Sequence, residues 1–361
     1  MKRMKRVGRR CLCGLLLLCG TSVGTAHAAA ASASVPAAAT LAAPATLPVA
    51  VPLGQEGVAW LGKVVGAARE QNYSGTFVYR NGGHGETSRI THLVQDGREL
   101  ERLEVLDGSP REVIREGDEI RCYLPETRTL IIEKRDWRGA FPVMLPTSLA
   151  GLTEFYDIRK GALERIAGRD AQVVVLEPRD AWRYGHKFWV DTDSGLLLKA
   201  GMLDERNGTV ETFAFTQLQV GGAIDRESLK PKFDTQMQGW RILDLQAGSP
   251  RQRNDRWLFK VSLPGFRKIA DMKRRSFHRH RGSHAGAAAD DAAHLVFSDG
   301  IASISVFIEP LGDKPVLGEV TLGAVNIYRR AQDGHLIIVL GEVPRRTLKV
   351  FGDGIELRTR P

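Results

Sequence analysis

The sequence has 361 residues and a formal net charge of +9, with 43% hydrophobic and 26% charged residues. A chain of this size can bury an ordinary hydrophobic core and is long enough for two domains. Three of its four cysteines, Cys11, Cys13 and Cys19, lie near the N-terminus, so a fold held by disulfides is excluded once that segment is removed.

Residues 1–28 have the three-part layout of a secretory signal. Six Lys and Arg residues precede the apolar run 11–19, and Ala26-His27-Ala28 supplies the small residues of a cleavage site. The apolar run is shorter than the ~20 residues that cross a bilayer, which makes a membrane anchor the weaker alternative. Removal of the segment leaves 45 of the 51 basic residues against 42 acidic ones, a net charge of about +3. We therefore expect a periplasmic protein with no nucleic-acid partner.

The following part of the chain predicts a helix and then an antiparallel meander. Residues 29–52 are uncharged and rich in Ala and Pro, which is typical of a flexible tether. Apolar residues recur at helical spacing from Val58 to Ala68. From Tyr73 onward, alternating runs are separated by turns such as Asp96-Gly97, which is the strongest short-range hairpin signal. We predict an N-terminal domain over residues 53–222.

The alternation is lost between Lys134 and Leu152, where large apolar residues occur without a strand period. A loop leading to a short helix near 148–156 fits this segment. Its side chains are suited to line a lipid-sized cavity beside the sheet, and filling of the hydrophobic core is the alternative interpretation. The candidate lipid-binding residues are Trp137, Phe141, Met144, Leu145, Leu149 and Leu152.

A boundary and a second domain follow. Residues 223–256 are rich in Gly, Pro, Gln and charge and are predicted to be a linker. The second domain, 257–361, shows short strand patterns and a helix from Pro344 to Phe351. Residues 273–292 are predicted to be a mobile loop, and the basic residues at its start attract anions, with a solvated surface as the alternative. The candidate residues for anionic partners are Lys273, Arg274 and Arg275.

No motif in the sequence supports catalysis, a metal site or a cofactor. The pattern G-x-S-x-G at 20–24 lies inside the secretory signal and is removed with it. Residues 57–64 resemble a P-loop, but Val64 stands where a Ser or Thr would hold magnesium. The histidines of the 273–292 loop lack a cysteine or paired carboxylates nearby. Cys122 lies in a strand pattern and is predicted to be a small core residue.

Five stretches carry a family resemblance: Gln71–Arg80, Phe188–Leu196, Leu263–Phe266, Ser298–Ile301 and Gly341–Pro344. In this order they resemble the MucB/RseB family of periplasmic sigma-E regulators, and the match extends over most of the chain beyond the tether. The tether and the His- and Arg-rich loop depart from the family pattern.

The resemblance implies a mainly β fold. It implies an N-terminal unclosed antiparallel β-barrel with helices against its concave side, like the lipoprotein carriers LolA and LolB, and a smaller β-rich C-terminal domain. It also implies that the protein binds the periplasmic part of a membrane-spanning anti-sigma factor and shields it from the protease that begins its degradation. Lipopolysaccharide or mislocalised lipoprotein would then release the partner. No catalytic residue is carried over, so we expect a binding protein and not an enzyme.

The residues and the resemblance together give a specific hypothesis. Acyl chains enter the N-terminal domain near Phe141–Leu152, while Arg274 and Arg275 help to hold anionic groups of the partner. The main rival is a periplasmic lipoprotein or lipid carrier, which shares the first domain but has no need of the second. A secreted hydrolase is a more distant alternative. The sequence leaves open which lipid is sensed, which domain makes the main partner contact, and whether the protein forms a homodimer.

Overall fold

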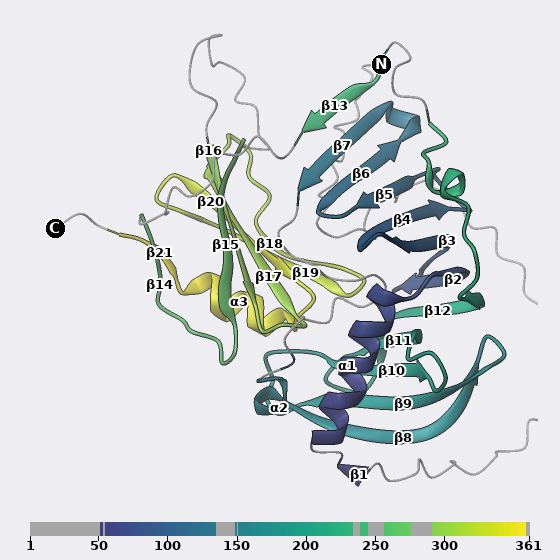
Figure 1. Cartoon of the computed structure of the whole chain (residues 1–361). Coiled ribbons are helices and arrows are strands. Elements are labelled where there is room, and N and C mark those ends of the chain that lie inside the picture. The colour runs from purple at the N-terminus through teal and green to yellow at the C-terminus, as the bar shows by residue number, and fades with distance from the viewer. Residues whose placement is uncertain are drawn as a thin grey trace, which may run out of the picture. The chain divides into compact units, whose positions relative to one another are not determined.

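Two β-sheets dominate the computed structural model of the protein, and most of their neighbouring strands are antiparallel (Figure 1). The structure describes residues 51–52, 55–134, 149, 151–233, 239–244, 256–275 and 291–358. Residues 50–361 form one unit by their contacts. Within the described ranges, no helix is long and apolar enough to cross a membrane.

The N-terminal sheet is open and has thirteen strands among the described residues. They are β1 (Val51–Pro52), β2 (Tyr73–Asn81), β3 (His84–Gln95), β4 (Arg98–Val105), β5 (Glu112–Glu116), β6 (Glu119–Leu124), β7 (Thr129–Lys134), β8 (Tyr156–Ile166), β9 (Arg169–Pro178), β10 (Gly185–Asp191), β11 (Leu197–Leu203), β12 (Thr209–Val220) and β13 (Arg241–Asp244). Their spatial order is β1-β8-β9-β10-β11-β12-β2-β3-β4-β5-β6-β7-β13. The edge strands β1 and β13 are not joined to each other, so the sheet does not close.

Alternation and tight turns fix the register of this sheet. Asp96 and Gly97, between β3 and β4, have φ angles of 52° and 71°, as the two central positions of a type I′ hairpin turn require. Leu103 lies opposite Val113, and Val113 lies opposite Cys122, so these three residues share one face of the sheet. All three are buried, which confirms the prediction that Cys122 is a core residue.

The predicted first helix is confirmed as α1 (Gln55–Glu70), which crosses strands β8–β12 in Figure 1. It buries Leu61, Val64 and Ala67. After its last turn, the Gln71 side-chain amide donates to the Ser194 carbonyl at 2.6 Å. The apolar stripe and this hydrogen bond fix the helix to the turn between β10 and β11. Two shorter helical turns, η1 (Pro125–Thr127) and α2 (Leu152–Phe155), lie elsewhere in this part of the chain.

The segment after β12 belongs structurally to the first sheet. A 3-10 turn, η2 (Arg226–Leu229), covers β3 and β4 through Leu229, and Trp240 packs edge-on against Tyr123 of β6. Strand β13 then pairs in parallel with β7. The predicted linker 223–256 therefore contains a strand of the N-terminal sheet. Its four mostly exposed residues show no alternation, which is why the pattern did not reveal it.

The C-terminal part contains a six-stranded sheet and a two-stranded ribbon among the described residues. The sheet has β15 (Arg267–Arg275), β16 (Asp291–Ser298), β17 (Ser303–Pro310), β18 (Gly318–Leu322), β19 (Val325–Gln332) and β20 (His335–Gly341), and the ribbon pairs β14 (Trp257–Phe259) with β21 (Ile355–Leu357). The spatial order of the sheet is β15-β16-β17-β20-β19-β18. Helix α3 (Arg345–Asp353) packs on β19 and β20 and completes a core that includes Leu348 and Phe351. The helix predicted from Pro344 to Phe351 is thus confirmed.

The fold class is confirmed as mainly β, with an unclosed N-terminal sheet and a separate, smaller C-terminal sheet. The sequence patterns did not predict β8, whose second half is mostly exposed, or β15, which is rich in Lys and Arg and therefore does not show a clear apolar alternation. Strand β15 continues through Arg275, so the predicted loop 273–292 begins later than expected. Val51 and Pro52, assigned to the tether, pair with Lys160 and Arg159 of β8. The secretory signal and residues 29–50 lie outside the described residues, and the domain boundaries stay predictions.

Candidate functional site

One face of the N-terminal sheet carries a row of buried aromatic side chains. Phe188 lies opposite Ala200, and Ala200 lies opposite Phe213, so the two phenylalanines share this face. The ring centroid of Phe213 is 4.8 Å from that of Phe77, and the Phe188 ring stacks on His186 at 5.8 Å. We call Phe77, His186, Phe188, Phe213 and Phe215 the aromatic face.

The aromatic face carries no charge at neutral pH. Burial lowers the pKa of His186 to about 4, so its imidazole is neutral. The remaining members are phenylalanines, which bury large apolar area. All five side chains are at most 9% exposed, so they form an uncharged, apolar part of the interior and not an open surface.

The same face of the sheet becomes charged over β3–β5. Arg115 donates to Glu99 at 3.0 Å and to Glu101 at 3.3 Å, and the nearby Glu101 carboxylate raises the pKa of Arg115. The buried ring of His92 stacks on Tyr73 at 4.9 Å. Since placing hydrocarbon over buried charges costs free energy, the aromatic face is the better surface for an acyl chain.

Two of the six candidate lipid-binding residues lie within the described chain. Leu149 is partly buried, and its Cδ1 atom is 4.0 Å from the position of a Cβ built on Gly62 of α1. Leu152 begins α2 and is 2% exposed, so it fills the core and does not line an open surface. The other four candidates, Trp137, Phe141, Met144 and Leu145, lie outside the described residues.

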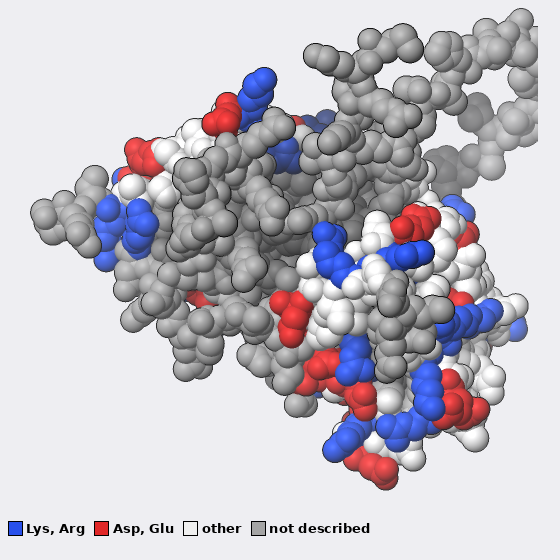
Figure 2. All heavy atoms as spheres, turned by 90° about the horizontal axis from the view of Figure 1, so that it is seen from above, with Lys and Arg blue, Asp and Glu red and all other residues white. Residues whose placement is uncertain are grey.

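The candidate anion-binding residues are the last three of β15. Lys273, Arg274 and Arg275 pair with Ala293, Ala292 and Asp291 of β16, and their side chains lie outside what the structure describes. Over the described part of the face shown in Figure 2, Lys and Arg side chains are interspersed with Asp and Glu. No group of three or more His, Cys, Asp or Glu residues suited to a metal ion occurs within the described ranges.

A buried arginine joins the two sheets. Arg183, in the loop between β9 and β10, has a side chain with 0% exposure and donates to Asp299 at 2.5 Å. It also donates to Asp180 at 2.9 Å and to the Pro264 carbonyl at 2.5 Å. Its guanidinium carbon lies 4.7 Å from the centre of the Phe155 ring. Charge, hydrogen bonds and aromatic contacts are therefore all provided for this cation, as a buried arginine requires.

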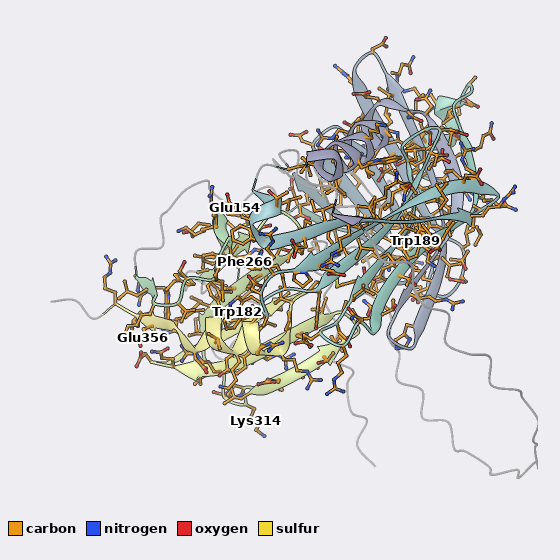
Figure 3. The ribbon with its side chains drawn as sticks, turned by 90° about the horizontal axis from the view of Figure 1, so that it is seen from below. Glu154, Trp182, Trp189, Phe266, Lys314 and Glu356 are labelled. Atoms are coloured by element: carbon orange, nitrogen blue, oxygen red, sulfur yellow. The ribbon has the colours of Figure 1, made fainter. Side chains whose placement is uncertain are left out.

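Two of the stretches that carry the family resemblance meet at this arginine. In Leu263–Phe266, Gly265 has φ +80°, and a Cβ built there would lie 2.6 Å from Phe155, so only glycine fits. The ring of Phe266 lies 5.1 Å from the Arg183 guanidinium. In Ser298–Ile301, the second carboxylate oxygen of Asp299 accepts the Ile301 amide at 2.9 Å. Figure 3 shows Phe266 and Trp182 where the teal and yellow ribbons meet.

A second junction lies at the end of β2. The Asn81 side-chain oxygen accepts the Ala324 amide at 2.7 Å, which fixes the turn between β18 and β19 to the first sheet. Nearby, the Asn326 side chain donates to the Tyr184 hydroxyl at 2.9 Å and to the Val343 carbonyl at 2.8 Å. These contacts again connect loops of one sheet with the other through buried polar groups.

This second junction brings two carboxyl groups close together. Glu211 of β12 accepts the Tyr79 hydroxyl at 2.6 Å, and burial raises the pKa of Glu211. Burial and the nearby Glu211 carboxylate raise the pKa of Glu342 to about 8. The pair therefore retains a proton at neutral pH, because two adjacent carboxylates in a poorly solvated site repel each other.

The sequence analysis missed both junctions. Arg183, Asn81 and Glu211 belong to no chemical motif, and their partners lie far away along the chain. The signal that was available lay in the resemblance, because Leu263–Phe266, Ser298–Ile301 and Gly341–Pro344 all contribute to the junctions. Sequence alone did not indicate that these stretches meet.

Comparisons with known proteins agree with this architecture. The family models for the MucB/RseB N-terminal domain and the MucB/RseB C-terminal domain match residues 56–233 and 251–356. The chain is 34% identical to the sigma factor AlgU regulatory protein MucB of Pseudomonas aeruginosa over 324 residues, which covers 87% of this chain and 94% of the relative. It is 27% identical to the sigma-E factor regulatory protein RseB of Salmonella typhimurium, covering 81% and 88%.

Solved structures show the same similarity. The complex structure of Pseudomonas aeruginosa MucA/MucB matches with a TM-score of 0.65 and 30% identity, covering 84% of this chain and 100% of the matched chain. The crystal structure of MucB in complex with MucA(peri) matches with a TM-score of 0.64 and 29% identity, with the same coverage.

Proposed function

This chain belongs to the MucB/RseB family, and we propose on that basis that it is a periplasmic negative regulator of an envelope-stress sigma factor. It binds the periplasmic segment of a membrane-spanning anti-sigma factor and shields that segment from proteolysis. Lipopolysaccharide or the acyl chains of mislocalised lipoprotein release the segment, and degradation of the anti-sigma factor then frees the sigma factor.

The observation that carries this proposal is the match to a complex. MucB has been crystallised with MucA(peri), and the whole of that MucB chain is covered by the match to this protein. The secretory signal predicted over residues 1–28 supports the same compartment for the present chain. The relatives are named as regulatory proteins, which supports a binding protein and not an enzyme.

The lipid-responsive site of this proposal is the aromatic face together with the segment from Trp137 to Leu152. Leu149 already lies against α1, and Phe77, Phe188 and Phe213 are uncharged but buried, so an acyl chain would reach them only by displacing what covers them. Leu152 is buried to the same extent as these phenylalanines and begins α2. Acyl chains would be held through Phe141, Met144 and Leu145, whose large apolar side chains precede Leu149 in the sequence.

Release of the partner requires a difference in affinity. A lipid displaces the anti-sigma segment only if it binds the partner-free protein better than the complex. A preference of about 1.4 kcal/mol gives a tenfold shift in affinity. In this proposal Lys273, Arg274 and Arg275 hold anionic groups of the partner and contribute to the affinity that the lipid must overcome.

Calorimetric titration of the mature protein with the purified periplasmic segment of its anti-sigma factor tests the proposal. We expect tight binding that weakens when lipopolysaccharide is added. The variant Phe141→Asp/Leu145→Asp should keep the affinity for the segment but lose the response to lipid. Absence of binding in both conditions would overturn the proposal and favour a lipoprotein or lipid carrier.

A further inference from the structure

The two edges of the C-terminal sheet differ in how they are protected. Strand β15 forms one edge, and it carries Lys268 and Arg267 and is interrupted by a bulge after Lys268. Charges and bulges are the usual means of preventing a further strand from adding to an edge. Strand β18 forms the other edge, and all five of its residues are exposed. Its side chains include a single acid, Glu319, and no basic residue.

The exposed side chains at β18 are mainly apolar. Val316 and Leu317, just before the strand, are 65% and 51% exposed, and Val320 and Leu322 within it are 37% and 38% exposed. Val320 lies opposite the partly buried Ile327 and Leu322 opposite Val325, so Val320 and Leu322 share one face of the sheet with these residues. Monomeric proteins seldom expose apolar groups in such a cluster unless they bind something there.

The main chain of β18 defines what kind of partner fits. Leu322 and Val325 flank a two-residue turn in which Gly323 has φ +61°, as the first central position of a type II′ turn requires. Hydrogen-bonding direction alternates along a strand, so the amide and carbonyl groups of Glu319 and Thr321 point away from β19. Among the described strands, none pairs with this outer side. Water satisfies these groups in the free protein, and an extended chain can replace that water by pairing along the edge.

Three basic residues lie beside the strand, where Asp313 and Glu319 are the acids. Lys314 is exposed and projects from the edge of the molecule in Figure 3. Arg329 lies opposite Gly318 at one end of β18, and Arg345 donates to the Thr321 hydroxyl at 2.8 Å. Across the sheet edge, these cations favour a chain that carries acidic residues next to its apolar ones.

We propose that the free edge of β18 binds an extended segment of the anti-sigma factor's periplasmic part by strand addition, with alternate apolar side chains of the segment on Val320 and Leu322. This inference rests on the proposed function and names the surface that performs it. Main-chain pairing supplies affinity in such complexes, and the alternate side chains supply specificity. The flanking acids of the segment lie near Lys314 and Arg329.

Two variants and a matched control test the proposal in the full mature protein. Glu319→Pro removes an outward-facing amide without removing a bond to β19, because proline is tolerated where the amide of an edge strand faces solvent. Val320→Ser/Leu322→Ser removes the apolar contacts. Each should weaken binding of the purified periplasmic segment by about tenfold or more. Leu163→Ser, at an exposed position of β8 with 66% exposure, should change affinity by less than about twofold.

Amide hydrogen exchange of the wild-type protein gives a readout that does not depend on the variants folding. Exchange at Glu319 and Thr321 should be fast in the free protein and slow strongly when the segment is bound. Wild-type binding without this protection, or with unchanged affinity in both β18 variants, would overturn the edge assignment while leaving the proposed function intact. Protection that appears without the segment and rises with protein concentration would also overturn it, since a second copy would then occupy the edge. Absence of binding by the wild type would remove the proposed function and this inference together.

Discussion

Both junctions between the sheets bury ionisable side chains, but the first pairs a cation with acids and the second brings two acids together. At Arg183, a buried cation meets Asp180 and Asp299, so its charge is fully compensated. At the end of β2, Glu211 and Glu342 meet, no cation forms an ion pair with either of them within the described ranges, and they are accommodated by keeping a proton. Burial raises the pKa of Asp299, so the ion pair of the first junction loses its negative partner at low pH, whereas the second junction loses its shared proton as the pH rises.

Replacing Arg183 should have the largest effect on stability. In Arg183→Met the Asp299 carboxylate remains buried without its partner, and we expect the free energy of unfolding to fall by about 3–5 kcal/mol. Denaturant titration measures this loss. The double variant Arg183→Met/Asp299→Asn should recover part of it, because the orphaned charge is then removed.

Arg179→Met is the matched control for that prediction. Arg179 pairs with Asp157 at 2.8 Å, but both side chains are about half exposed, with values of 51% and 48%. Such surface pairs contribute less than about 1 kcal/mol. Equal losses in Arg179→Met and Arg183→Met would contradict the view that Arg183 joins the sheets.

Gly323→Ala should disturb the second junction by an intermediate amount. A Cβ at this position would overlap the side-chain amide of Asn81. The oxygen of that side chain accepts a hydrogen bond from the Ala324 backbone N–H in the native structure. We expect the free energy of unfolding to fall by about 1–3 kcal/mol. Gly334→Ala provides the control, since Gly334 also has positive φ (+71°) but has no atom within 4 Å of the added carbon. If both variants lose the same stability, backbone strain alone explains the effect and the Asn81 contact contributes nothing.

The last prediction concerns how the free energy of unfolding depends on pH and on the variant Glu342→Gln. The pKa of Glu342 is raised to about 8 in the folded protein, against about 4.3 in the unfolded chain. The stability that its bound proton contributes is therefore fully present below the unfolded pKa and declines as the pH rises toward 8. The glutamine variant should lack much of this decline. At pH 8 we expect it to be more stable than the wild type, with little difference near pH 4. Parallel stability curves for the two proteins between pH 4 and 8 would show that the pair does not titrate in this range.

Sequence patterns predicted some elements of this fold and not others. Strands β2 and β3 alternate and end at Asx-Gly turns, and β20 begins directly after one, so their positions could be predicted. Strand β8 could not, because its outer residues are exposed on both faces, and β13 has only four residues. Arg183, Asn81 and Glu342 were missed for a different reason. Their roles depend on contacts between residues far apart in the sequence, and no local period records such contacts.

The residues of the candidate lipid site were also predicted only in part. The sequence indicated an apolar segment before Leu152, but it did not indicate that Phe77, Phe188 and Phe213 form one face, because they come from three separated strands. It suggested Leu152 as a lipid-binding residue, and in the structure this residue is 2% exposed, like the buried phenylalanines of the aromatic face. Composition cannot distinguish a leucine that fills the interior from one that lines a binding surface.

The most direct test of the account is a cleavage assay. The purified periplasmic segment of the anti-sigma factor would be exposed to the protease that begins its degradation, with and without the mature protein and with and without lipopolysaccharide. The account predicts that the protein slows cleavage strongly and that lipopolysaccharide restores the rate. An unchanged cleavage rate in the presence of saturating protein would contradict the claim that this chain shields the anti-sigma factor.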